Sequence, residues 1–403
     1  MRRAGIFVFI SLLLLATLLV AGCAGQARGV IPLSDNPGDE GLPLRVSWVR
    51  TLMEQGREDI WRPMQYAPPT IADNVVYLGN TENVFYAFDA STGDTLWKFN
   101  TNGPVESGAT LLGADAVVIG DGDGYVYCLN RQTGFVKWVY RVQGQVMGRI
   151  VTDGDLVFVR TTHERVYALR AADGKWKWMQ SREVPVNFTI RGVASPVLDG
   201  DRLLVGYADG YFIGYNKADG TEVFKTLLEK GERFLDIDAT PILDGANLYV
   251  ASYSGTFYCL SRENASIQWT FRQGSVQSAA VAGERVFLGD DQGFVHALNK
   301  RTGELYWSYD LRENDQKRSI AKSPRRRLKA PTNPVPFNGL ILVASSSGYI
   351  YALDQAVGQE KWEYWPGFGV TTEIVTHGNS IFIHTNFGNL YCLKPNYRFN
   401  DKN

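Results

Sequence analysis

Residues Asp121 to Trp138 read DGDGYVYCLNRQTGFVKW. An Asp/Gly turn is followed by a run of strand-forming residues, a second turn that ends at Gly134, and a short strand that closes on Trp138. Turn residues that separate runs of β-branched and aromatic residues are typical of consecutive β-hairpins. The stretch therefore predicts two hairpins in succession, and related stretches recur along the chain.

Each copy of the repeat is recognised by a small residue between two large ones, as in Tyr127-Cys128-Leu129. The copies are 38 to 55 residues apart, and most intervals are close to 40. Eight copies occur, and their centres are Ala87, Cys128, Ala168, Gly214, Cys259, Ala297, Ala352 and Cys392. Ten residues further on, seven copies carry an aromatic residue: Trp97, Trp138, Trp178, Phe224, Trp269, Trp307 and Trp362. The eighth copy lacks one, and Trp48 near the other end of the chain lies in a segment of matching composition.

A period near 40 residues with about four short strands per unit is typical of a β-propeller. Helical repeats of this period would need apolar residues at helical spacing, whereas AVVIGDGDGYVYCLN gives strand-like runs that are broken by Gly and Asp. We therefore predict an all-β chain that folds as an eight-bladed β-propeller with four-stranded antiparallel blades over residues 45–395. The N-terminal segment VSWVRTL, residues 46–52, should supply the strand that closes the ring.

The N-terminal residues carry a separate export signal. Residues 1–22 combine two arginines with an apolar run that is too short to span a bilayer comfortably, as in a secretory signal peptide. Val20-Ala21-Gly22-Cys23 resembles the bacterial lipobox, so Cys23 is the predicted site of lipidation (palmitate). An ordinary signal peptide with a chance cysteine is the alternative. Residues 23–44 are predicted to be a flexible tether, and residues 396–403 a C-terminal tail.

The remaining cysteines and the acidic turns do not suggest chemistry. Cys128, Cys259 and Cys392 occupy the same place in three non-adjacent repeats, too far apart for a disulfide, so we expect small buried thiols. The acidic turns at Asp121 and Asp290 are explained by turn formation and lack the other ligands of a calcium loop. No catalytic motif occurs, and we expect no catalytic residues, no metal, no cofactor and no enzyme activity.

The end of the repeat, YAFDASTGDTLW at residues 86–97, resembles the repeat of pyrroloquinoline-quinone (PQQ) enzymes. Quinoprotein alcohol dehydrogenases share this repeat but carry two adjacent bridged cysteines, and this chain has no Cys-Cys pair. Residues 46–393 also resemble the family of the outer-membrane-protein assembly factor BamB. That resemblance implies a lipid-anchored eight-bladed propeller that keeps the repeat without the cofactor.

Two segments outside the repeat favour the second family. FTIRGVASP at residues 188–196 and RFLDIDATP at residues 233–241 are similar to two BamB segments. In that family these segments help to form the surface that meets BamA, the barrel-inserting subunit. The resemblance implies a partner-binding role for Phe188, Ile190, Arg191, Asp236 and Asp238.

The spacing of these two segments gives an independent expectation about their geometry. Arg191 and Asp236 each lie five residues before a proline that opens an apolar strand and a DG turn, so they occupy equivalent positions on adjacent blades. They could pair with each other across the blade interface, which is compatible with partner binding. Asp236 and Asp238 point the same way if the chain is extended, and two like charges tend to face water or a partner.

One basic segment lies within the longest interval, at residues 311–331, where lysines and arginines concentrate between Lys317 and Lys329. It suits contact with anionic lipid headgroups or an acidic surface, and equally a solvated loop. The chain as a whole has a formal net charge of −1. We do not expect nucleic acid to be a partner of an exported protein.

Together these features predict a non-enzymatic scaffold that is lipid-anchored in the outer membrane and faces the periplasm. The resemblance implies that it binds a BamA-like subunit, assists the insertion of outer-membrane proteins, and possibly meets their unfolded precursors. The alternative is a periplasmic propeller that binds PQQ or another ligand, as a quinoprotein-like oxidoreductase does.

Overall fold

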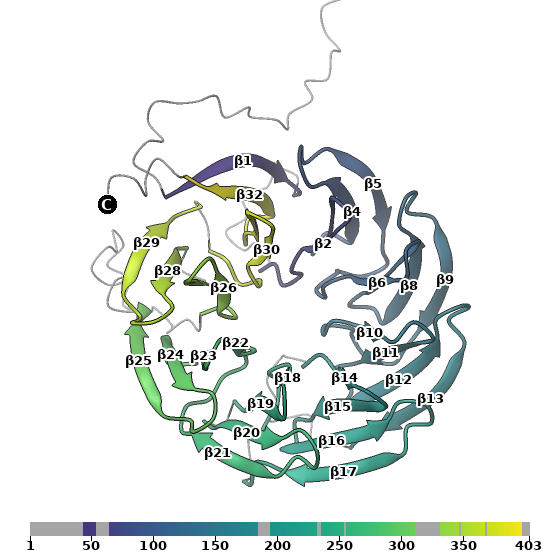
Figure 1. The fold of residues 1–403 in the computed structure, drawn as a ribbon. Coiled ribbons are helices and arrows are strands. Elements are labelled where there is room, and N and C mark those ends of the chain that lie inside the picture. Colours follow the sequence, from purple (N-terminus) through teal and green to yellow (C-terminus); the bar gives the residue numbers. More distant parts are fainter. Residues whose placement is uncertain are drawn as a thin grey trace, which may run out of the picture.

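The computed structural model describes residues 43–53, 64–183, 194–231, 235–253, 255–311, 331–345, 348–366 and 369–396. These residues form eight four-stranded sheets, each antiparallel, which follow one another around a central opening (Figure 1). The predicted eight-bladed β-propeller is therefore confirmed. No helix in the described part of the chain is long and apolar enough to cross a membrane.

Within each blade the strands run outward from the central channel. The innermost strands are β2 (Thr70–Ala72), β6 (Thr110–Leu112), β10 (Val151–Thr152), β14 (Val197–Asp199), β18 (Ile242–Asp244), β22 (Ala280–Ala282), β26 (Val335–Phe337) and β30 (Val375–His377). The second strands are β3 (Val75–Gly79), β7 (Ala116–Gly120), β11 (Leu156–Arg160), β15 (Arg202–Gly206), β19 (Asn247–Ala251), β23 (Arg285–Gly289), β27 (Leu340–Ala344) and β31 (Ser380–His384).

The two outer strands of each blade contain the repeat itself. The third strands are β4 (Val84–Asp89), β8 (Tyr125–Asn130), β12 (Arg165–Arg170), β16 (Tyr211–Asn216), β20 (Phe257–Ser261), β24 (Phe294–Asn299), β28 (Ile350–Asp354) and β32 (Asn389–Pro395). The outermost strands are β5 (Thr95–Asn100), β9 (Val136–Arg141), β13 (Trp176–Ser181), β17 (Glu222–Leu227), β21 (Ile267–Phe271), β25 (Leu305–Asp310), β29 (Glu360–Tyr364) and β1 (Leu44–Thr51). We number the blades 1 to 8 from β2.

The ring is closed by the N-terminal strand, as predicted. Strand β1 pairs with β32 and completes blade 8 in the order β1-β32-β31-β30, so the two ends of the propeller meet in one sheet (Figure 1). Trp48 of β1 packs on blade 1, where its indole Nε1 donates a hydrogen bond of 2.9 Å to the carbonyl of Ala90. The first strand thus joins blade 8 to blade 1.

The same tryptophan contact is repeated between other blades. Trp97 of blade 1 donates from Nε1 to the Arg131 carbonyl of blade 2 at 2.9 Å, and Trp138 makes the equivalent bond to Ala171 at 2.8 Å. The glycine of the TG turn provides room for the indole: a Cβ on Gly93, which has a φ of 74°, would lie 2.7 Å from the ring of Trp48. The aromatic residue and the TG turn of the repeat are therefore two halves of one interblade contact.

Eight hydrophobic clusters fill the spaces between neighbouring blades. One combines Trp48 and Leu390 of blade 8 with Val76 and Phe88 of blade 1. Strands in such clusters are apolar on both faces because each blade is covered on two sides. A chain of this length can fold as one body because it has many small cores instead of a single large one.

The predicted fates of the cysteines and acidic turns hold in this structure. Cys128, Cys259 and Cys392 are free, buried thiols. Asp121 forms its turn by accepting hydrogen bonds from the backbone N–H groups of Asp123 and Tyr125 at 3.0 and 2.8 Å.

Candidate functional site

Of the residues predicted to bind a partner, Asp236 and Asp238 can be placed in the structure. Phe188, Ile190 and Arg191 lie outside the described residues, and so does the basic segment from Lys317 to Lys329. Asp236 and Asp238 belong to the connection between β17 of blade 4 and β18 of blade 5.

Both carboxylates are buried, with 1% of Asp236 and 7% of Asp238 exposed. The expectation that they face water or a partner directly is therefore wrong. The physical reason is that the backbone of this connection is fixed against the blades. The Ile237 N–H donates to the Tyr207 carbonyl at 3.2 Å, and the Asp236 carbonyl accepts from the Tyr253 N–H at 3.0 Å. Ile237 itself is fully buried, which holds the two neighbouring carboxylates inside.

A buried arginine lies close to this pair and was not predicted. Arg160 ends strand β11 of blade 3, and its side chain has no exposed surface. Its Nη2 forms an ion pair of 3.0 Å with the Glu164 carboxylate, and its Nη1 donates to the Ala194 carbonyl at 3.2 Å. Its guanidinium also lies over the Tyr207 ring, 5.4 Å from the centroid. One side chain of blade 3 thereby contacts two residues of blade 4.

The partner of this arginine has an unusual backbone conformation. Glu164 has a φ of 52°, in the left-handed region, where the corresponding turns of blades 2 and 4 use Gly124 and Gly210. A left-handed non-glycine residue costs about 1–2 kcal/mol. The Glu164 carboxylate offsets this cost by pairing with Arg160 and by accepting a hydrogen bond of 3.3 Å from the Ala208 N–H.

The electrostatics connect three blades. Burial raises the pKa of Asp238 to about 7; Arg160 opposes this rise, and the charges of Asp236 and Glu164 add to it. Burial disfavours the charge of Arg160, but Glu164 and Asp238 outweigh it and raise the pKa of the guanidinium. The Oδ2 atom of Asp238 has no hydrogen-bond partner in the structure. Arg160, Glu164, Asp236 and Asp238 form what we call the buried charge cluster of blades 3 to 5.

The cluster lies at the ends of both segments that the sequence singled out. Ala194, whose carbonyl binds Arg160, directly follows the undescribed residues 184–193. Asp236 comes two residues after the undescribed residues 232–234. The cluster therefore fixes the point at which each segment rejoins its blade.

A second ion pair borders the cluster near the surface. Arg182, just after β13, binds the Asp209 carboxylate through both Nε and Nη2, and the Nε bond is 2.9 Å long. Its guanidinium lies over the rings of Tyr207 and Tyr211, 5.4 and 4.9 Å from their centroids. Tyr207 is thus enclosed between Arg160 and Arg182.

Sequence reasoning missed Arg160, although a signal for it exists. The second strand ends in Gly or Ala in six blades, as at Gly79 and Ala251, because the next blade packs closely there. Blades 3 and 8 depart from that pattern with Arg160 and His384, both fully buried. A charged residue in a position reserved for small residues was the available clue.

The comparisons with known proteins follow from this geometry. The family model described as "Outer membrane protein assembly factor BamB" matches residues 45–124, 80–309 and 273–396, which together span the propeller. The chain belongs to the BamB family of outer membrane protein assembly factors. This confirms the family resemblance inferred from the repeat and the two segments.

Curated relatives in this family align over almost their whole length. BamB of Pseudomonas aeruginosa is 28% identical over 389 residues, covering 94% of this chain and 96% of the relative. BamB of Escherichia coli K12 is 25% identical over 401 residues, covering 94% and 97%.

Solved structures show the same fold. BamB from Moraxella catarrhalis superposes with a TM-score of 0.73 at 21% identity, covering 87% of this chain and 99% of that one. The quinohemoprotein alcohol dehydrogenase of Comamonas testosteroni reaches a TM-score of 0.68 at 13% identity, covering 90% and 78%. At these identities the likeness concerns the propeller fold alone.

Proposed function

We propose that this BamB-family chain is a non-enzymatic scaffold of outer-membrane β-barrel assembly, anchored in the outer membrane by a lipid on Cys23 and facing the periplasm. It binds a BamA-like subunit and assists the insertion of outer-membrane proteins, whose unfolded precursors are its second class of partner. Family membership over the whole propeller supports the assembly role.

The partner surface in this proposal lies over blades 3 to 5. Phe188, Ile190 and Arg191 supply the contacts, as the similarity of their segment to BamB implies. Asp236 and Asp238 act from below, because their burial makes them supports of the neighbouring connection instead of contact residues. The observation that carries this assignment is the buried charge cluster, which anchors both segments to three successive blades.

A rigid support of this kind has a physical advantage for binding. Ordering a flexible loop on association costs about 0.5–1.5 kcal/mol for each immobilised side chain, so a segment held at its base loses less. The buried ion pair of Arg160 and Glu164 is also directional, which fixes how blade 3 sits against blade 4. The cluster is a means of presenting the two segments in one fixed arrangement.

Co-purification tests the proposal. The full-length chain is isolated from solubilised outer membranes, and the amount of bound BamA-like subunit is measured for wild type, Arg191→Glu and Phe188→Ala. Loss of about 2 kcal/mol at a central interface residue corresponds to binding weakened roughly thirtyfold. Arg301→Glu is the matched control, since Arg301 is an exposed arginine on blade 6. Full recovery of the subunit with both variants contradicts the partner surface.

A further inference from the structure

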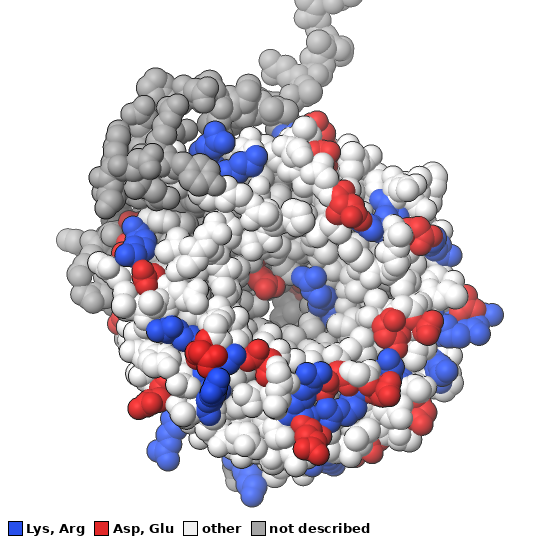
Figure 2. All heavy atoms as spheres, viewed as in Figure 1, with Lys and Arg blue, Asp and Glu red and all other residues white. Residues whose placement is uncertain are grey.

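The central channel holds a cavity that the assembly role does not use. Its volume is about 1020 Å³, and inner-strand residues of the blades line it. Figure 2 shows that the channel mouth is hollowed and that basic and acidic side chains lie inside it, set apart from those on the rim. A cavity of this size is in the range that holds small organic ligands.

The charges in the cavity occupy equivalent positions of the repeat. Each blade places one residue two positions before its inner strand, and these residues line the cavity. Most are neutral, such as Ser195, Thr240 and Asn333. Blade 3 has Arg149 and blade 8 has Glu373 at this position. The two charged residues therefore depart from an otherwise neutral set.

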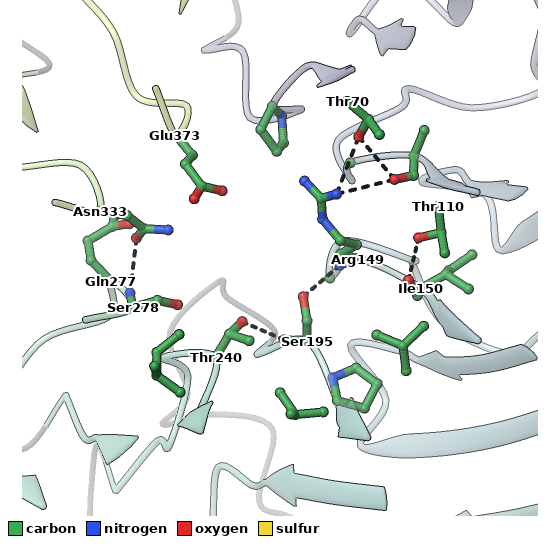
Figure 3. Close-up of a pocket in the computed structure, with 18 of the residues that line it drawn as sticks. Thr70, Thr110, Arg149, Ile150, Ser195, Thr240, Gln277, Ser278, Asn333 and Glu373 are labelled. Carbon is green, nitrogen blue, oxygen red and sulfur yellow. Dashed lines mark hydrogen bonds between the residues drawn. The ribbon is translucent and has the colours of Figure 1, made fainter. Parts of the chain in front are cut away.

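Arg149 is held firmly on one side only. Its backbone N–H donates to Ser195 Oγ at 2.8 Å, and its Nη1 donates to Thr70 Oγ1 and to the Ala109 carbonyl, each at 3.3 Å (Figure 3). Gly108 gives the guanidinium its room, because a Cβ there would lie 2.7 Å from Nη2. An arginine has five N–H donors, and those on Nη2 and Nε make no hydrogen bond with the described residues.

Glu373 faces this guanidinium across the cavity (Figure 3). Neither Arg149 nor Glu373 takes part in an ion pair among the described residues. Burial lowers the pKa of Arg149 and raises that of Glu373, and each is opposed by the charge of the other. Two half-buried charges that lose hydration without closing on each other are uncommon in a purely structural role.

Neutral groups beside Glu373 add hydrogen-bonding capacity. Asn333 Oδ1 accepts from the Ser278 N–H at 2.9 Å, which turns the amide NH₂ of Asn333 toward the cavity (Figure 3). Glu106 also lines the cavity and is buried. The lining thus carries one cation and two carboxylates, which disfavours a polyanion such as PQQ; the guanidinium likewise disfavours a simple cation.

We propose that the channel mouth is a binding site for a short peptide with free termini, whose carboxylate binds Arg149 and whose ammonium group binds Glu373. The guanidinium matches a carboxylate through paired N–H donors. Peptide N–H and C=O groups between the termini suit the hydroxyl and amide groups of the ring. The proposal does not depend on the partner surface of blades 3 to 5.

Calorimetric titration of the full-length, detergent-solubilised protein tests this site. The probe is triglycine, compared with N-acetyltriglycine and triglycinamide, which each lack one terminal charge. We expect saturable binding of triglycine and at least tenfold weaker binding of both capped peptides. Arg149→Gln should weaken triglycine at least tenfold but leave triglycinamide unchanged, and Glu373→Gln should do the same with respect to N-acetyltriglycine.

Controls separate this result from misfolding. Each variant is melted first, and Arg149→Lys provides a second variant that keeps the charge while losing the paired donors. The exposed arginine variant Arg301→Gln should bind triglycine like wild type. The proposal is overturned if triglycine does not bind saturably, if the capped peptides bind equally well, or if PQQ binds more tightly than triglycine.

Discussion

The clasp formed by β1 makes a quantitative prediction for Trp48→Ala. Trp48 is 3% exposed, its indole donates to the Ala90 carbonyl at 2.9 Å, and its ring meets Phe382 with centroids 5.9 Å apart. The contact lies where the two ends of the ring meet, so no continuous chain holds blade 8 to blade 1 there. Removing the side chain weakens the only strand that spans this junction among the described residues.

The expected loss follows from the burial of the indole. Replacing a buried Trp by Ala costs about 3–5 kcal/mol, and a buried carbonyl left without its donor belongs to the upper part of that range. At about 2 °C per kcal/mol for a large domain, the melting temperature should fall by roughly 8 °C. Deleting residues 45–53 should cost more, because β32 then becomes an exposed sheet edge.

Thermal unfolding followed by circular dichroism measures this effect. Trp176→Ala is the matched control, since Trp176 is 56% exposed on β13 and its loss should change stability by less than about 0.5 kcal/mol. If Trp48→Ala melts within about 1 °C of wild type while Trp176→Ala does the same, the clasp does not stabilise the ring and the reasoning fails.

Three further outcomes are expected. Because the folded pKa of Asp238, about 7, lies above its usual value of 3.8, the protonated form stabilises the fold at low pH and this contribution is lost as the pH rises through 7. Asp238→Asn should therefore gain about 3 kcal/mol relative to wild type between about pH 5 and about pH 8 in denaturant titrations, and a constant difference would argue against the buried carboxylate. Burial raises the pKa of Cys128 and Cys392 to about 11 and that of Cys259 to about 12, so a thiol reagent at about pH 8 should label none of them until the protein unfolds; labelling of the native protein would contradict this. Cys23→Ser should abolish membrane attachment, and a mature mutant protein that still sediments with outer membranes would disprove the lipid anchor.

Much of the fold could be predicted because the repeat encodes contacts between neighbours. The TG turn and the aromatic residue ten positions after the repeat centre are separated in sequence but meet across each interface, as Trp48 and Gly93 do. The missing aromatic residue of the eighth copy therefore pointed to an N-terminal strand, and β1 fills that place. Cys128 was predicted as buried for the same reason, since its position is shared by every blade.

The site was less accessible to sequence reasoning because it depends on departures from the repeat. Asp236 and Asp238 were expected at the surface from their charge alone, and the buried Ile237 between them reverses that expectation. Arg160 and Glu164 occupy a small-residue position and a glycine position, and their pairing becomes visible only when blades 3 to 5 are assembled. Interblade electrostatics is a property of the closed ring and not of any one copy.

The central claim is that the segment around Arg191 binds a BamA-like subunit on the support of blades 3 to 5. The most direct test is the dissociation constant between the full-length chain and the purified subunit in detergent, measured for wild type, Arg191→Glu and the control Arg301→Glu. The account predicts at least tenfold weaker binding for Arg191→Glu, with an unchanged melting temperature, and wild-type binding for Arg301→Glu. Equal dissociation constants for all three proteins would contradict it.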